Sequence, residues 1–440
     1  MKKASVVLLS LALLLVPAVI FAGGSSESKD DASGKPIELV YWSHYGQSPA
    51  FVQAFADAAN VALKNLGYDN VTCRAEVIEY SGYETKYLTA FTSGNGPDMF
   101  LARPSDWALE GGLNPIALPL PDDVAKAWDD ALASVYVGDG VFNGKRYGFP
   151  SEGGSLQLLY INTDYMKEAG LNPETAYPKT IEEFVDVAKK MTKYDASGNV
   201  VRSGYQPRYL GGGEGVSGKF IPFIHVFGGR VLSEDLTLAT GYINGPEAKS
   251  AFQFNKDLVY KDKVVNLDFG APETAFQSGQ TAMIFREGWF AQDVLDKAPN
   301  INFMVVPYIS GAANPISHAG SGIWCNMINS RSKHADICAA LFKELAKPEY
   351  DVMLHEPAGY PPVLAATMTL DNAYFGKMPY AQAVIDSLSK DPAPIYDISS
   401  RWSSVAYMIG DSFAAVLGGA DVSAELDKLA QKMQVVLNQK

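Results

Sequence analysis

Two short apolar runs joined by a polar loop constrain this chain more than any other feature. The stretch at residues 142–170 reads FNGKRYGFPSEGGSLQLLYINTDYMKEAG. Asn143-Gly144 predicts a hairpin, because a type I′ turn needs positive φ at both central residues. The returning strand stops at Pro150, a polar loop follows, and Leu156 to Ile161 then has the length of a buried strand. We interpret this stretch as a hinge strand that leads from one lobe into a second.

The length and charge of the chain limit the classes of protein to consider. A chain of 440 residues is too long for one ordinary core and suits two lobes. The formal net charge is −13 at pH 7. Such an acidic surface repels nucleic acid and anionic membranes, so we expect no nucleic-acid partner.

The first 22 residues have the pattern of a secretory signal. Lys2 and Lys3 form a basic start, Val6 to Phe21 is apolar, and Ala22 fits the small residue before a cleavage site. An uncleaved membrane anchor is the alternative. Residues 23–36, GGSSESKDDASGKP, then form a flexible leader without core-forming residues.

Cysteine usage agrees with an exported protein that lacks a disulfide framework. Cys73, Cys325 and Cys338 each lie in an apolar pattern, so we expect buried thiols, with a bridge between the last two left open. No cysteine precedes Cys73, which argues against a lipid-anchored lipoprotein. We therefore expect a periplasmic or extracellular protein.

The first hundred residues after the leader alternate between strand and helix patterns. Residues 37–42, 71–77 and 98–102 are predicted strands, with helical spacing between them. This order predicts a parallel α/β sheet, and ligands bind beyond the carboxyl ends of such strands. The prediction directs attention to the residues from Trp42 to Tyr45 and from Arg103 to Trp107.

Several catalytic or cofactor motifs fail when their context is considered. Residues 213–218 match GxGxxG, but a predicted loop precedes them and Pro222 interrupts the segment after them. No spacing of His or Cys indicates zinc, and no G-x-S-x-G elbow is present. We expect no metal, no cofactor and no catalysis. A secreted glycoside hydrolase, which needs two carboxylates flanking the scissile bond, is the alternative, but acidic residues are common enough that a pair arises easily without this role.

Aromatic residues at the ends of predicted elements carry more information. Flat rings stack on the apolar faces of sugars, while amides, guanidinium groups and carboxylates bind the hydroxyls. The ring of any one such residue could instead belong to the core. The members of the set are Trp42, Tyr45, Trp107, Trp289, Trp324, Tyr360 and Trp402.

Four ordered blocks resemble the extracellular solute-binding proteins of ABC transporters, in the branch that includes maltose-binding protein. The blocks are FTSGNGPDMFLA; FNGKRYGFP with LLYINTDYMKEAGL and YPKTIEEFVDVAKKMT; FQSGQTAMIFREGW; and HAGSGIWCNMINSRSKHADICAALFKELAKPE. The resemblance spans about residues 37–440. By this resemblance, Trp289 falls on the sugar-stacking Trp of the family, and residues 103–107 fall on a ligand-contacting loop.

The resemblance implies an α/β, two-lobed periplasmic-binding-protein fold. Each lobe is expected to have a mainly parallel sheet flanked by helices, joined by a multi-crossing hinge. Lobe 1 would comprise residues 37–150 and 321–358, and lobe 2 residues 151–320 and 359–440. After the crossing at 148–154, further crossings are expected near 318–322 and 359–362.

We therefore predict a monomeric binding protein that captures a sugar or oligosaccharide and delivers it to the permease subunits of an ABC importer. Another small polar solute, such as a glycerol phosphodiester, a polyamine or a betaine, is the alternative within the same fold. An anionic ligand would need several arginines to converge. The predicted ligand-binding residues are Trp42, His44, Tyr45, Asp106, Trp107, Glu152, Arg208, Glu287, Trp289, Ser321, Trp324, Tyr360 and Trp402.

Overall fold

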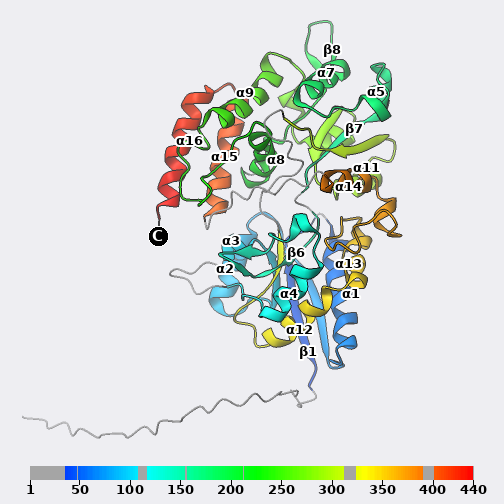
Figure 1. Cartoon of the computed structure of the whole chain (residues 1–440), viewed down its shortest axis with the longest axis vertical. Coiled ribbons are helices and arrows are strands. Elements are labelled where there is room, and N and C mark those ends of the chain that lie inside the picture. The colour runs from blue at the N-terminus through cyan, green and yellow to red at the C-terminus, as the bar shows by residue number, and fades with distance from the viewer. Residues whose placement is uncertain are drawn as a thin grey trace, which may run out of the picture. The chain divides into compact units, whose positions relative to one another are not determined.

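The computed structural model describes most of the chain after the leader. The described residues are 35–439 without 47, 108–115, 154–155, 212, 312–323 and 390–400, and the side chains of 105, 106, 213 and 214 are also outside the description. The predicted signal peptide and the predicted crossing at 318–322 lie outside these residues. Residues 37–440 form one compact unit (Figure 1).

The first sheet has the strand order β2-β1-β3-β12-β6. Its strands are β1 (Ile37–Ser43), β2 (Val71–Val77), β3 (Met99–Ala102), β6 (Gly148–Pro150) and β12 (Cys325–Ile328). The predicted parallel pairings are confirmed, since β1 runs parallel to both β2 and β3. The late strand β12 inserts between β3 and β6 and runs antiparallel to both.

The second sheet corrects one part of the predicted fold. Its order is β10-β7-β11, from β7 (Leu158–Asn162), β10 (Met283–Arg286) and β11 (Phe303–Pro307). Both pairings are antiparallel, so this sheet is not mainly parallel as expected. The chain enters along β7 from the first sheet, and β10 and β11 both run back toward the point of entry. This direction brings the residues after β10 beside the start of β7.

The stretch from residue 142 onward has the predicted local structure. Asn143 and Gly144 have φ values of 49° and 71°, as the type I′ turn requires, and they join β4 (Val141–Phe142) to β5 (Lys145–Arg146). The chain then passes from β6 in the first sheet to β7 in the second. Residues 151–157 therefore connect the two sheets.

Helix starts follow the sequence signals with two small differences. Pro49 opens α1 (Pro49–Asn65), a position that proline favours, but the preceding Ser48 makes no capping hydrogen bond with its side chain. Thr180 caps α7 (Ile181–Met191) by accepting from the N–H of Glu183 at 3.3 Å. Oε2 of Glu183 accepts from the N–H of Lys179, one residue before Thr180, whose N–H a capping box would use.

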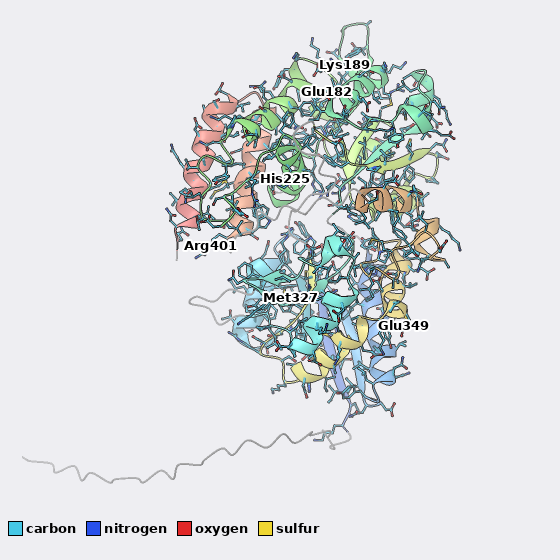
Figure 2. All side chains as sticks on the ribbon, viewed as in Figure 1. Glu182, Lys189, His225, Met327, Glu349 and Arg401 are labelled. Atoms are coloured by element: carbon cyan, nitrogen blue, oxygen red, sulfur yellow. The ribbon has the colours of Figure 1, made fainter. Side chains whose placement is uncertain are left out.

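Helix α8 (Gly213–Val226) runs through Pro222, contrary to the expectation that this proline interrupts the segment. Proline removes one backbone hydrogen bond, but tertiary packing can hold such a helix together. The side chains around Pro222 are buried, including those of Phe220, Ile221 and Phe223. The helix therefore continues into the core, with His225 near its end (Figure 2).

The remaining elements complete the two groups of helices in Figure 1. Helices α8, α9, α15 and α16 contact one another, while α1 contacts β2, α12 and α13. Their bounds are α2 (Tyr83–Ser93), α3 (Pro104–Trp107), α4 (Asp122–Ala131), α5 (Thr163–Glu168), α6 (Pro173–Ala176), β8 (Lys193–Tyr194), β9 (Val200–Arg202), α9 (Pro246–Tyr260), α10 (Pro272–Gln277), α11 (Phe290–Lys297), α12 (Ala335–Leu345), α13 (Pro348–His355), η3 (Glu356–Ala358), α14 (Ala381–Leu388), α15 (Trp402–Leu417) and α16 (Val422–Leu437).

Two clusters of buried apolar side chains hold these elements together. The first surrounds the first sheet and continues to Phe276 and Phe290 beside the second. The second joins β7 and β10 to α8, α15 and α16, with Leu426, Leu429 and Met433 on the buried face of α16. The three cysteines are free and buried, which confirms the expected thiols and leaves no 325–338 bridge. In the part of the chain that the structure describes, no helix is long and apolar enough to cross a membrane.

Candidate ligand-binding site

The carboxyl ends of β1 and β3 carry a cluster of aromatic rings. His44 is fully buried, and its ring stacks on Tyr83 with a centroid distance of 4.5 Å and lies 4.0 Å from the Trp324 ring. The guanidinium of Arg103 lies 3.9 Å from the centre of the same Trp324 ring. Burial, together with the charge of Arg103, lowers the pKa of His44 to about 3, so His44 is neutral.

Glu152 lies just after β6, at the start of the connection between the sheets. The Tyr45 hydroxyl donates a hydrogen bond of 2.9 Å to Oε1 of Glu152. The second oxygen, Oε2, is buried and has no hydrogen-bond partner among the described residues. Burial and the nearby charge of Glu287 raise the pKa of Glu152 to about 7. This carboxyl group can therefore accept from a ligand or, when protonated, donate to one.

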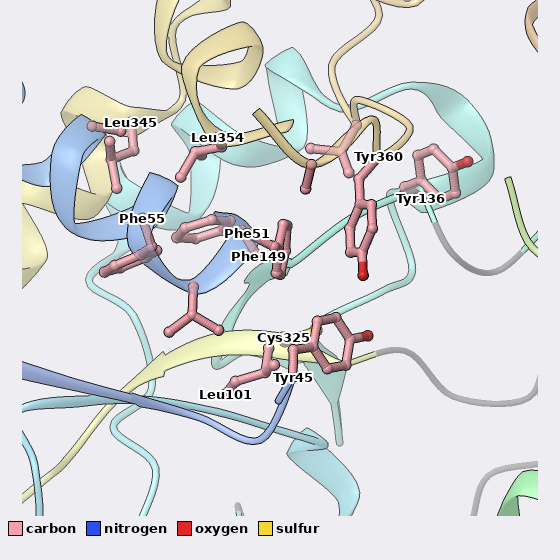
Figure 3. Close-up of a cluster of buried hydrophobic side chains, with 14 of the residues drawn as sticks. Tyr45, Phe51, Phe55, Leu101, Tyr136, Phe149, Cys325, Leu345, Leu354 and Tyr360 are labelled. Atoms are coloured by element: carbon pink, nitrogen blue, oxygen red, sulfur yellow. The ribbon is translucent and has the colours of Figure 1, made fainter. Parts of the chain in front are cut away.

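Trp289 lies shortly after the end of β10 at Arg286 and is partly exposed. The guanidinium of Arg286 lies 4.6 Å from the centre of the Trp289 ring, and the Tyr360 ring lies 6.2 Å away. Tyr360 in turn packs on Phe51 of α1 at 4.6 Å and lies 6.3 Å from Tyr45 (Figure 3). Residues that are far apart in sequence thus form one continuous aromatic cluster, in which Trp289 is the partly exposed member.

Five charged side chains form an alternating series, which we call the charge ladder: Arg208, Glu273, Arg286, Glu287 and Lys219. Oε1 of Glu273 lies 3.1 Å from Nη1 of Arg208 and 3.0 Å from Nε of Arg286. Nη1 of Arg286 lies 3.0 Å from Oε2 of Glu287, and Lys219 pairs with Oε1 of Glu287. Each cation of the ladder therefore faces a carboxylate.

Burial and pairing compete in setting the charge of each ladder group. Burial alone would raise the pKa of Glu287, but Arg286 and Lys219 outweigh it and hold the pKa at about 2. The same competition, with Arg286 and Arg208, holds the pKa of Glu273 below its ordinary value. Burial lowers the pKa of Lys219 to about 8, although Glu287 opposes the shift. Glu273, Glu287 and Lys219 are therefore charged near pH 7.

A second buried charge pair links the segment after β6 to residues 363–364. His355 is the last residue of α13. Its Nε2 lies 2.9 Å from the carbonyl oxygen of Ser151. Its Nδ1 lies 2.6 Å from the carbonyl oxygen of Asp351 and 3.0 Å from Oδ1 of the same residue. Both ring nitrogens face acceptors, so both carry protons and the ring is an imidazolium. Asp351 also accepts from the backbone N–H of Leu364 at 3.0 Å. We call Asp351 and His355 the hinge pair, because they join residues 151 and 364.

The hinge pair predicts a specific dependence of stability on pH. Burial disfavours the charged ring, but Asp351 outweighs burial and raises the pKa of His355 above its ordinary value. The stability that His355 contributes is thus fully present below about pH 6.5 and is lost as pH rises through the elevated pKa. As pH rises above about 6.5, urea unfolding midpoints of the wild type should fall more steeply than those of His355→Gln.

Glu152 also makes the protein less stable as pH rises from the ordinary pKa of a glutamate to about pH 7. The reason is that the fold favours the neutral form of this side chain. The charge of His355 opposes this shift, so the two proteins are compared in the Glu152→Gln background, where the contribution is absent from both. Parallel pH profiles for the wild type and His355→Gln would contradict an imidazolium at this position.

The structure brings together many, though not all, of the predicted site residues. Trp42 contacts Tyr87 and Lys86, at one side of the aromatic cluster. Trp107 is buried against Phe91 and Phe100. Trp402 is 1% exposed and belongs to the second apolar cluster. The side chain of Asp106, and Ser321 altogether, lie outside the described residues. The predicted residues that lie in the aromatic and charged clusters are His44, Tyr45, Glu152, Arg208, Glu287, Trp289, Trp324 and Tyr360.

Sequence reasoning did not find Lys219, Glu273 or the hinge pair. Lys219 carried a usable signal, since it is the only lysine or arginine in the segment GEGVSGKFIPFIHV, which is mostly small or apolar. Glu273 carried none, because a glutamate after Pro272 in a first helical turn is ordinary. Its importance comes only from the two arginines that contact it.

The chain passes from one sheet to a second at residues 151–157, with polar and aromatic side chains near the connection, an arrangement typical of two-lobed solute-binding proteins. A family model described as bacterial extracellular solute-binding protein matches residues 50–373. The chain belongs to this family.

Comparisons with individual proteins give relatives and fold neighbours. The sn-glycerol-3-phosphate-binding periplasmic protein UgpB of Brucella abortus (strain 2308) is 27% identical over 308 residues, which are 66% of this chain and 67% of that protein. The structure of the cyclic α-maltosyl-1,6-maltose binding protein of Arthrobacter globiformis matches with a TM-score of 0.73 at 21% identity, over 91% of this chain and 99% of that one. A solute-binding protein of Thermotoga lettingae bound with α-D-tagatose matches with a TM-score of 0.73 at 20% identity, over 92% and 100% of the two chains. These structural matches support the two-lobed α/β fold.

Proposed function

We propose that this protein captures a neutral sugar or oligosaccharide and delivers it to the permease subunits of an ABC importer. The observation that carries the proposal is the surface around Trp289. A partly exposed indole ring, backed by Arg286 and next to Tyr360, lies near a carboxyl group that has an unpartnered oxygen. Stacking surfaces beside polar groups suit a ring whose faces are apolar and whose edge carries hydroxyls.

The fold neighbours support the same class of ligand. Their names refer to cyclic α-maltosyl-1,6-maltose and α-D-tagatose. We infer export by the N-terminal signal to the periplasm or the outside of the cell, a monomeric state and no catalysis. Closure of the lobes on the ligand would follow from contacts made by both, since a ligand shifts an equilibrium only by its differential affinity.

A phosphate ester is the second candidate, because the relatives in Brucella are named for binding sn-glycerol 3-phosphate. Arg208 and Arg286 lie close together, as an anionic ligand requires. Both, however, already contact Glu273, and Arg286 also contacts Glu287. The pairing favours a neutral ligand over this alternative.

The proposal is tested by native mass spectrometry of the purified protein, followed by thermal unfolding with a panel of mono- and oligosaccharides, polyols, polyamines, betaines and phosphate esters. We expect a bound mass that matches a sugar, and a rise in the unfolding temperature with intact sugars, because a ligand that binds only the folded state stabilises it. Release of a smaller sugar during incubation would show a hydrolase. Stabilisation by amines or phosphate esters alone would overturn the sugar proposal.

A further inference from the structure

We propose that Glu273 determines the charge class of the ligand: by occupying the guanidinium groups of Arg208 and Arg286, it prevents the site from binding phosphorylated ligands. This inference rests on the proposed function, since it concerns the same site and names the solutes that the site rejects. Glu273 is thus a specificity-determining residue that acts through the two arginines.

The geometry places both arginines on a single carboxylate oxygen. Nη1 of Arg208 and Nε of Arg286 lie 3.1 and 3.0 Å from Oε1 of Glu273. Guanidinium groups bind phosphate through paired N–H donors, and two adjacent guanidinium groups make a strong site for a dianion. With Glu273 in place, a phosphate that approached these donors would also meet the carboxylate, and like charges at such distances repel.

The ladder lies at the ligand surface rather than in a remote part of the fold. Arg286 covers the ring of Trp289 at 4.6 Å, so a ligand on Trp289 comes within a few ångströms of the ladder. The Arg208 guanidinium lies against Gly215 near the start of α8, where a Cβ would come within 2.9 Å of Nη2. Helix α8 also carries Lys219, so the cations of the ladder are held in place by packing and by pairing.

The balance of charge in the ladder explains why a single residue can determine whether the site accepts an anionic ligand. Three cations face two carboxylates, and Glu152 adds a third acidic group that is close enough to Glu287 to feel its charge. The site is therefore close to neutral in the wild type. Loss of the Glu273 charge leaves two guanidinium groups without their shared carboxylate, in a partly buried place where charges are poorly screened. Arg103, which lies over the Trp324 ring, is present in every variant, so its charge does not affect the comparison.

The test compares the wild type with Glu273→Gln, which keeps the size of the side chain. Binding of sn-glycerol 3-phosphate, inorganic phosphate and uncharged glycerol is measured by isothermal titration calorimetry at low salt. We expect Glu273→Gln to bind sn-glycerol 3-phosphate at least about tenfold more tightly than the wild type does, with no gain for glycerol. Adding Arg208→Gln to this variant should remove most of the gain.

Glu168→Gln is the matched control, because Glu168 also joins two cations, Lys193 and Arg202, but on an exposed surface away from the site. It should leave phosphate binding unchanged. Equal affinity of the wild type and Glu273→Gln for sn-glycerol 3-phosphate would overturn the inference, as would an equal gain in Glu168→Gln.

A measurement on the wild type keeps the inference testable if Glu273→Gln does not fold. Micromolar binding of sn-glycerol 3-phosphate to the wild type, abolished by Arg208→Gln, would show that the arginines are available to phosphate and would overturn the inference. Failure of the wild type to bind any sugar in the panel, with the phosphate results as expected, would instead count against the proposed sugar ligand alone.

Discussion

Replacing Asp351 with asparagine is expected to lower the free energy of unfolding by about 3–5 kcal/mol, the usual cost of removing one partner of a buried charge pair. The carboxylate is 1% exposed and accepts from the backbone N–H groups of Val363 and Leu364 and from the hydroxyl of Thr367. It also neutralises the His355 imidazolium, with Oδ1 3.0 Å from Nδ1. An asparagine keeps one oxygen and turns an NH₂ group toward donors, so both the charge and part of the hydrogen bonding are lost.

Urea unfolding monitored by tryptophan fluorescence at about pH 6 measures this loss. Asp186→Asn is the control, because Asp186 forms an exposed pair with Lys190 on α7. It should leave the midpoint unchanged, as exposed pairs contribute little. An Asp351→Asn protein that unfolds at the wild-type urea concentration would show that His355 is neutral and that the hinge pair contributes nothing.

Replacing Trp289 with alanine is expected to weaken binding of the sugar that gives the largest thermal shift by about 2 kcal/mol or more, roughly thirtyfold. The indole supplies a flat apolar face, and Arg286 stacks on it at 4.6 Å, so truncation removes the contact with the ligand and uncovers the guanidinium. Because Trp289 is only partly buried, the folded state should be retained. Calorimetric titration measures the loss.

Two variants separate the stacking role from a general effect on the fold. Trp289→Phe keeps a flat ring and should retain much of the affinity. Tyr194→Ala removes an exposed ring from the hairpin of β8 and β9 and should bind as the wild type does. Undiminished sugar binding by Trp289→Ala would remove the main support for the stacking surface.

Local features were predictable from the sequence because they depend on neighbouring residues. The turn at Asn143-Gly144 needs two residues that tolerate positive φ, and the structure has such values at both. Helix α16 buries Leu426, Leu429 and Met433 because the spacing of these residues places them on one face. The position of Trp289 after a buried strand followed from a short motif and is confirmed by β10. The lobe boundaries remain a prediction.

The direction of strands in the second sheet was not predictable in the same way. Parallel pairing was expected by extension from the first sheet, where strands and helices alternate. In the second sheet, long helical segments separate β7 from β10, and such connections allow either direction. The antiparallel pairing of Arg286 with Leu158 places the residues after β10 beside the start of β7. The site beside the connecting segment depends on this pairing.

The sequence by itself determined the two apolar strands around residues 151–157, the polar loop between them, and hence a chain that passes from one sheet to another. It did not determine the charges of the groups around that passage. His44 and His355 are the same residue type and are both fully enclosed, yet the first is neutral beside Arg103 and the second is charged beside Asp351. Only the tertiary structure decides this, because the protonation of a buried group depends on the charges that distant parts of the chain bring next to it.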